Sequence, residues 1–157
     1  MNVREIKFRG QSVINNHWEH GYFTFEGGYH VIRSFVSEWH KEGSPIIVKG
    51  NTVCQFTGLK DKNGKDIYEG DIIRREYEIG RDIIDPVSLG FVDREIEEAG
   101  YFIGIVHYRP SEGYVLNKCK KFDEDGVFLS QRSGVKIYSQ YAEVIGNIYE
   151  NIELINS

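Results

Sequence analysis

The sequence predicts a mainly β protein, and three features of its composition support this. The 157-residue chain holds 19 Ile and 13 Val, against only 5 Leu and 2 Ala. Branched side chains favour strands, whereas Leu and Ala are the leading apolar helix formers. Aromatic residues make up 13% of the chain, which also favours strands. A content of 17 Gly with only 3 Pro suits a chain with many tight turns.

Three strands are expected near the N-terminus, at residues 3–9, 18–25 and 29–36. In the first of them the apolar residues alternate with charged ones, as in a strand with one wet face. The second and third flank Gly27-Gly28, which is a hairpin signal. One alternative stays open, because some apolar residues here also have the spacing of a helix: Ile32, Phe35, Val36 and Trp39. The tight glycine turn favours the strand.

Short strands at residues 46–48 and 52–57 precede the strongest hairpin signal of the chain. That signal is Asn63-Gly64, because both residue types tolerate a positive φ. Gly70-Asp71 then turns the chain into a further strand at residues 72–73.

Residues 76–100 differ in character and are expected to form an insertion that contains one short helix. Asp85-Pro86 has the pattern of a helix N-cap followed by proline in the first turn. An acidic run follows at 93–98, and Gly100 has the place of a residue just beyond a helix end. We therefore expect the helix near residues 85–99.

The rest of the chain again has the pattern of strands, which are expected at residues 101–108, 113–116, 118–122, 127–129, 135–138 and 143–148. We divide the chain into an N-terminal β subdomain, residues 1–57, and a C-terminal β subdomain, residues 58–157. The two are expected to pack together, and a single domain is the alternative.

Charge and cysteine content predict a cytoplasmic protein that does not contact a membrane. The net charge is -5, and no run of about 18 apolar residues is present. The first five residues include an acid and no apolar run, so we expect no signal peptide. Cys54 and Cys119 are the two cysteines, and both are expected to be free, buried thiols.

The known motifs of enzymes are missing from the sequence. It contains no glycine-rich phosphate-binding loop, no G-x-S-x-G nucleophile elbow and no H-E-x-x-H zinc motif. His17 and His20 would lie on opposite faces of a strand, which is wrong for a shared metal. The acidic stretch from Asp61 lacks the Gly and Glu that a calcium-binding loop needs at its sixth and twelfth positions. We therefore expect no catalytic, cofactor-binding or metal-binding residues and no enzymatic activity.

Two basic clusters stand out, and one of them is a candidate nucleic-acid surface. Arg74-Arg75 is the first cluster. The second is a lysine-rich strand with aromatic neighbours, a combination on which bases can stack: Lys118, Lys120, Lys121, Tyr114 and Phe122. An exposed edge strand protected by lysines is the alternative interpretation, and it is the one we favour. The acidic net charge also disfavours a nucleic-acid partner.

Three segments of the chain form a recognisable set: REIKFRG at residues 4–10 with Trp18 and Gly21-Tyr22, TVCQFTGLKDKNGKDIYEGDII at residues 52–73, and EVIGNIYEN at residues 143–151 with Leu154. Together they resemble the YopX family of phage and prophage proteins. The segment GIVHY at residues 104–108 fits the middle strand of the family. The resemblance spans the chain and implies a mostly β, phage-encoded protein, but it supplies no catalytic or binding residues.

Gly70-Asp71 followed by two isoleucines also looks like the opening of small SH3-like barrels. By this analogy we expect an N-terminal β-meander followed by an SH3-like, barrel-type β unit. The absence of enzyme motifs and the family resemblance together favour a non-enzymatic binding or assembly protein. Its expected partners are further copies of itself and an unknown phage or host protein. A small-barrel protein associated with nucleic acid is the alternative.

Overall fold

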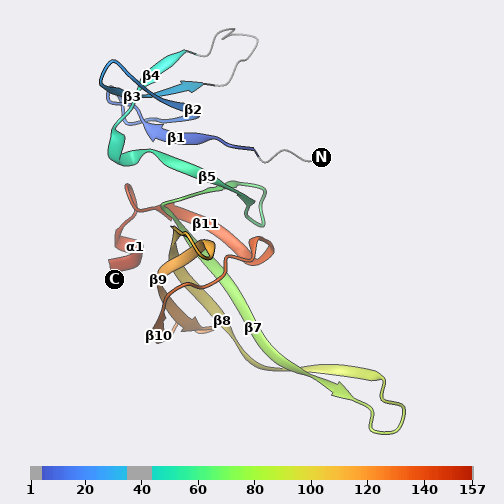
Figure 1. The fold of residues 1–157 in the computed structure, drawn as a ribbon. Coiled ribbons are helices and arrows are strands. Elements are labelled where there is room, and N and C mark those ends of the chain that lie inside the picture. Colours follow the sequence, from blue (N-terminus) through green and yellow to red (C-terminus); the bar gives the residue numbers. More distant parts are fainter. Residues whose placement is uncertain (1–4, 35–43, 157) are drawn as a thin grey trace.

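The computed structural model describes residues 5–34 and 44–156, which form two antiparallel sheets. Figure 1 shows the first sheet above the second, and a long two-stranded arm that projects from the second. Among the described residues the one α-helix is the four-residue α1 (Glu153–Asn156). The expected fold class, mainly β with one short helix, is therefore confirmed.

The first sheet contains six strands, and the N-terminal hairpin lies within it as expected. In pairing order the strands are β4 (Pro45–Ile47), β3 (Tyr29–Ser34), β2 (Trp18–Glu26), β1 (Phe8–Gln11), β5 (Cys54–Lys60) and β6 (Asp66–Tyr68). Gly27 and Gly28 join β2 to β3 with positive φ angles of 57° and 85°. Ile32 lies in β3, whereas the other residues with helical spacing, Phe35, Val36 and Trp39, lie outside the described residues.

The second sheet contains five strands and includes both long ones. In pairing order they are β10 (Phe128–Arg132), β9 (Gly113–Asp123), β8 (Phe91–Arg109), β7 (Asp71–Ile84) and β11 (Ala142–Asn147). The two strands expected at 113–116 and 118–122 are one strand, with an irregularity where Lys118 has a φ of 50°. The strand expected at 135–138 is wrong: only Val135 forms a bridge, and the left-handed backbone of Tyr138 turns the chain into a short 3-10 helix, η2 (Ser139–Tyr141).

The barrel and the division into subdomains stay predictions. The two edge strands of the second sheet, β10 and β11, each pair with one neighbour among the described residues. Strand β5 runs across the expected boundary at residue 58, and β6 is the last strand along the chain that belongs to the first sheet.

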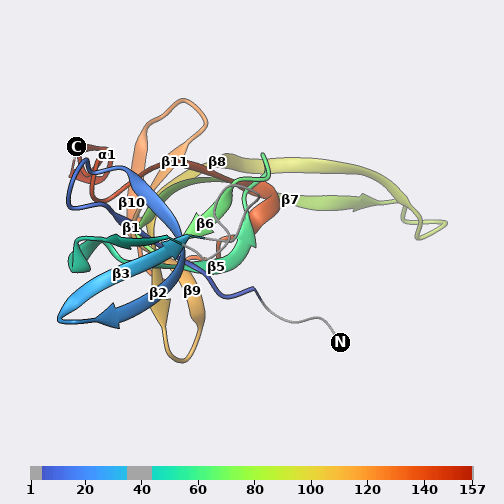
Figure 2. The ribbon, with the colours of Figure 1, turned by 90° about the horizontal axis from the view of Figure 1, so that it is seen from above.

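The helix expected near residues 85–99 is wrong, because this segment is part of a β-hairpin. Residues 76–100, called the arm below, comprise the outer halves of β7 and β8 and the tip between them (Figures 1 and 2). Asp85 does accept hydrogen bonds as a helix cap would, at 2.7 Å from the N–H of Val87 and 3.1 Å from that of Ser88. The chain then reverses through Leu89 instead of continuing as a helix, because the N–H of Asp85 pairs with the carbonyl of Gly90.

The main core lies against one face of the second sheet. Its buried residues come from five strands and from the segments between them: Ile67, Ile73, Phe102, Val106, Leu116, Cys119, Ile137 and Ala142. Ile67 belongs to β6 of the first sheet, so the two sheets share this core. A smaller cluster of Cys54, Phe56 and Tyr68 lies within the first sheet.

The turn at Asn63-Gly64 is present as expected, and it is fixed by a buried carboxylate. Gly64 has a φ of 82°, and the Asp61 side chain accepts hydrogen bonds from the N–H groups of Asn63 and Lys65, each at 2.9 Å. Its second oxygen accepts one from Val144 of β11 at 3.0 Å. Asp61 thus fastens the hairpin of the first sheet to an edge of the second.

Candidate functional site

A buried ion pair joins the two sheets. Arg9 of β1 donates from Nη2 to Oδ1 of Asp71 at the start of β7, at 2.7 Å. The other oxygen of Asp71 accepts the N–H of Tyr68 at 2.8 Å. The guanidinium of Arg9 also lies over the rings of Trp18 and Tyr68, 4.6 and 4.8 Å from their centroids. With both carboxylate oxygens and the guanidinium engaged, this cluster holds the sheets together, and we assign it a structural role.

The arm combines charged pairs between its two strands with exposed apolar side chains. Arg81 of β7 pairs across the hairpin with Glu95 at 2.9 Å and lies 3.6 Å from Glu97. Large apolar side chains nevertheless stay in solvent along the arm: Ile79, Ile83, Ile84, Val87, Leu89, Phe91, Val92 and Ile96. An isolated two-stranded hairpin is marginally stable in water, and beyond the five-stranded part of the sheet the arm consists of two strands only.

The apolar side chains are most exposed at the tip of the arm. Val87 is 92% exposed and Leu89 76% exposed. Leu89 also has a φ of 59°, which is the left-handed region that non-glycine residues rarely adopt. The tip therefore holds a bulky apolar side chain in a costly backbone conformation, at a place where folding does not bury it.

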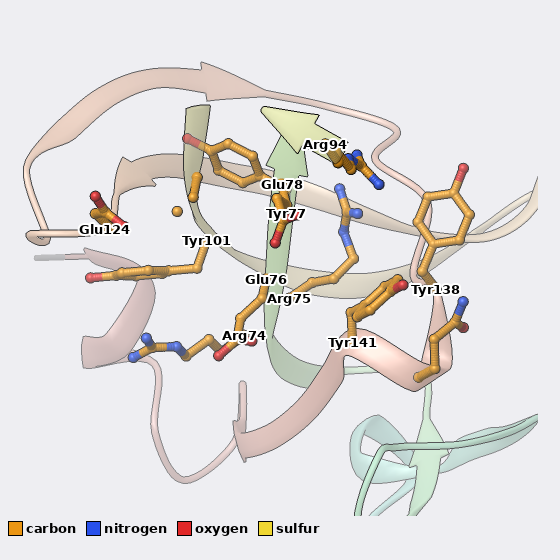
Figure 3. A pocket seen from close by; sticks show the side chains of 13 residues that line it. Arg74, Arg75, Glu76, Tyr77, Glu78, Arg94, Tyr101, Glu124, Tyr138 and Tyr141 are labelled. Carbon is orange, nitrogen blue, oxygen red and sulfur yellow. The ribbon is translucent and has the colours of Figure 1, made fainter. Parts of the chain in front are cut away.

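A pocket of about 560 Å³ lies at the base of the arm. The pairing of β11 with β7 ends at Ala142 and Arg75, and η2 lies beside the strand at this point. Arginines, glutamates and tyrosines supply most of the lining (Figure 3), which comprises Arg74, Arg75, Glu76, Tyr77, Glu78, Arg94, Ala99, Gly100, Tyr101, Glu124, Tyr138, Gln140 and Tyr141.

Arg75 is the unusual residue of this pocket. It is only 9% exposed, and its guanidinium carbon lies 4.8 Å from the ring centroid of Phe102 and 5.2 Å from that of Tyr138. Among the described residues no carboxylate pairs with it, and its buried Nε has no hydrogen-bond partner. Burial lowers the pKa of Arg75, against the opposing effects of Tyr138 and Cys119.

A stack of three side chains lies on the face of the second sheet opposite to Arg75, and two of its members, Arg74 and Tyr101, also line the pocket. The guanidinium of Arg74 lies 4.0 Å from the ring centroid of Tyr101. Tyr101 is stacked on Phe122 of the neighbouring strand, with centroids 5.0 Å apart and ring planes 20° apart. The lining of the pocket thus comes from both faces of β7, with Arg75 on one face and the Arg74–Tyr101 contact on the other.

The five residues expected to form a nucleic-acid surface all lie on β9, but the structure does not bring them together. Directly paired residues share a face of a sheet. Lys121 pairs with the buried Phe102, and its ammonium lies 3.0 Å from a carboxylate oxygen of Glu98. Lys120 and Phe122 pair with Ile103 and Tyr101 on the opposite face.

The other two members lie further along the strand. Tyr114 contacts Tyr108 near the other end of β9, with centroids 5.2 Å apart, and Lys118 is exposed at the strand irregularity. The alternative of a lysine-protected edge strand is wrong, because β9 lies between β8 and β10.

The cysteines agree with the expectation from the sequence. Cys54 and Cys119 are both free and buried. In the part of the chain that the structure describes, no group of three His, Cys, Asp or Glu side chains is arranged to hold a metal ion. Among the same residues no helix has the length and apolar character needed to cross a membrane.

The fold and these surfaces define an all-β protein with a projecting arm and a pocket of charged and aromatic side chains at the base of the arm. A comparison with family models then identifies the family: the model described as YopX protein matches residues 7–156. The chain belongs to the YopX family, which implies a protein of phage or prophage type. A comparison with curated proteins finds no match.

Proposed function

We propose that this protein is a non-enzymatic assembly protein of a phage or prophage that acts in the cytoplasm of a bacterial host. Its contact element is the arm, and its partner is a second copy of this chain. The observation that carries the proposal is the exposed apolar tip, where Val87, Leu89 and Phe91 extend into solvent at the end of a two-stranded hairpin.

Charge favours a contact between the arm of one copy and the body of another. The arm holds eight acidic and two basic residues, a net charge of -6. Because the whole chain carries -5, the remaining residues carry +1. Two arms side by side would repel each other, whereas an acidic arm against the body of a second copy would not. Reciprocal exchange of arms gives a closed, two-fold symmetric dimer, which is the commonest form of homo-oligomer.

Light scattering of the purified protein tests the proposal. The expected mass is twice the 18.2 kDa of one chain, and it is retained at high salt because apolar side chains make the main contact. Leu89→Asp should shift the mass to that of a single chain. Ile14→Asp is the matched control, because Ile14 is 89% exposed in a turn of the first sheet, and the dimer should persist. A wild-type protein that is monomeric at both salt concentrations would contradict the proposal.

Association with nucleic acid is the second candidate, and one observation favours it. Arg74, Tyr101 and Phe122 form a stack on the face of the second sheet to which Lys120 also belongs. Binding of a single-stranded oligonucleotide should then tighten as the salt concentration falls and weaken in Lys120→Glu. Absence of binding at low salt would exclude this function.

A further inference from the structure

We propose that the pocket at the base of the arm binds a small nucleotide, that is, an aromatic base carrying a single phosphate, with Arg75 as the anion-binding residue. This binding activity goes beyond the assembly role and does not depend on it.

Arg75 is a buried cation without an anion. Four charged side chains are buried among the described residues, and the charges of the other three all have partners, although Nε of Arg9, like that of Arg75, makes no hydrogen bond. Arg9 and Asp71 pair with each other, and Asp61 accepts three backbone N–H groups. Burying a charge that stays unpaired is costly, so proteins rarely keep one without a use for it. The guanidinium offers donors that suit a phosphate or carboxylate, and the pocket gives a ligand access to them.

The size and lining of the pocket favour a ligand larger than a bare anion. A space of about 560 Å³ lies within the range of sites for small organic molecules. Four tyrosines line it, and the ring centroid of Tyr138 lies 5.2 Å from the guanidinium carbon of Arg75. Figure 3 shows the guanidinium ends of Arg75 and Arg94 on the same side of the pocket, beside Tyr138. An aromatic ring against Tyr138 and Tyr141, with its anionic group at these arginines, would engage both kinds of lining side chain.

The acidic residues of the pocket limit the charge that it can accept. Glu76, Glu78 and Glu124 line the same space and would repel the successive phosphates of a strand. Their carboxylates can instead accept hydrogen bonds from the amino groups of a base and the hydroxyls of a sugar. A single nucleotide therefore fits this lining better than a polynucleotide.

Calorimetric titration with the four ribonucleoside monophosphates tests the proposal, with adenosine and inorganic phosphate as partial ligands. We expect at least one nucleotide to bind the wild-type protein more tightly than either partial ligand. Arg75→Met should weaken that binding by more than about tenfold, because a charge-assisted contact is lost. Arg94→Met should weaken it as well without altering a buried position. Arg81→Met is the matched control, because Arg81 lies on the arm outside the pocket, and binding should persist.

The thermal stability of Arg75→Met without ligand separates a binding role from a structural one. If the role of Arg75 is to bind an anion, its unpaired charge does not stabilise the unliganded protein. Met at this position, between Phe102 and Tyr138, should then leave the melting temperature equal to that of the wild type or raise it. A clear fall in melting temperature, with no nucleotide bound by the wild type, would show that Arg75 is a structural contact of those rings and would overturn the proposal.

Two other outcomes would also overturn the proposal. Phosphate binding as tight as nucleotide binding would show a plain anion site. Binding only of oligonucleotides, unaffected by Arg75→Met, would place the activity on another surface. Repeating the titration with Leu89→Asp keeps this test separate from the assembly proposal, because all the lining residues described here belong to one chain.

Discussion

Arg9 and Asp71, 62 positions apart in the sequence, form a buried ion pair of 2.7 Å that links β1 of the first sheet to β7 of the second. Asp71 is 1% exposed, and its second oxygen is held by the backbone of Tyr68. Burial raises the pKa of Asp71, and the neighbouring Arg9 opposes that effect. The charged form of Asp71 thus depends on Arg9, so the two residues stabilise the contact between the sheets only as a pair.

Removing one member of this pair should be strongly destabilising. Asp71→Ala leaves the Arg9 guanidinium buried without its anion, which should reduce the free energy of unfolding by about 3–5 kcal/mol. Urea denaturation followed by circular dichroism measures the change. The double variant Arg9→Leu with Asp71→Leu should lose less than the sum of the two single variants, because no uncompensated charge remains.

An exposed ion pair gives the control for that measurement. Arg33 of β3 pairs with Glu26 of β2 at 2.8 Å, and both side chains are well exposed. Arg33→Ala should therefore cost less than about 1 kcal/mol. Equal losses at the exposed and the buried pair would contradict the structural role of Arg9 and Asp71.

Asp61 should make the stability of the protein depend on pH in the acid range. Its burial would raise the pKa of the carboxyl, but the N–H groups of Val144, Lys65 and Asn63 outweigh burial and lower it below the usual 3.8. The unfolded chain then binds a proton more readily than the folded one. Asp61 thus stabilises the fold above about pH 4, and this contribution is lost as the pH falls through the lowered pKa.

The variant Asp61→Asn tests this sign. At pH 7 it should be less stable than the wild type by about 1–3 kcal/mol, because an amide oxygen replaces a carboxylate as acceptor. The difference between the two proteins should shrink as the pH falls toward 3. A difference that stays constant over this range in urea denaturation would show that the charge of Asp61 is unimportant.

Gly104 of β8 has no room for a side chain. A Cβ atom there would overlap Sγ of Cys119 and come within 3.1 Å of the Cβ of Leu116, and both neighbours are core residues. Gly104→Ala should therefore destabilise the protein by about 1–3 kcal/mol, the usual cost of overpacking a core. Adding Cys119→Ala removes the closest atom and should restore part of the loss. A double variant no more stable than Gly104→Ala would show that the overlap with Sγ of Cys119 is not the cause of the destabilisation.

Cys119 should be inert in the folded protein. Burial raises the pKa of its thiol to about 12, although Arg75 and Arg109 act in the opposite direction. The thiolate, which is the reactive form, is therefore scarce at pH 8. Burial raises the pKa of Cys54 as well. Neither thiol should react with an aromatic disulfide reagent until urea is added, whereas rapid reaction of the native protein would show that the core opens readily.

Much of the fold could be predicted from local sequence patterns. The Gly27-Gly28 and Asn63-Gly64 turns lie where their residue types predicted, because a positive φ is set by the residues themselves. The arm shows the limit of this reasoning. Asp85-Pro86 is equally suited to a helix start and to a tight turn, since in both cases the Asp side chain accepts nearby N–H groups. The pairing of β7 with β8 selects the tight turn over the helix.

The candidate site was harder to predict than the fold. Arg74 and Arg75 stood out as a basic pair, but neighbours on a strand face opposite sides, and only the end of β11 and the position of η2 make a pocket beside Arg75. The residues of β9 expected to form a nucleic-acid surface lie apart for a similar reason. The irregularity at Lys118 and the two faces of the strand separate residues that are close in sequence.

Replacing Leu89 with glycine should separate stability from assembly. Leu89 has a φ of 59° and is 76% exposed, so glycine relieves a strained backbone and removes little buried surface. The free energy of unfolding measured in urea at low protein concentration should rise by up to about 1 kcal/mol. The dimer measured by light scattering should weaken, because the apolar side chain at the tip is gone. Val13→Gly, in a turn of the first sheet, should leave the dimer intact. If Leu89→Gly were more stable and equally dimeric, the leucine would have no role in contact between copies, and the arm tip would not be the assembly element.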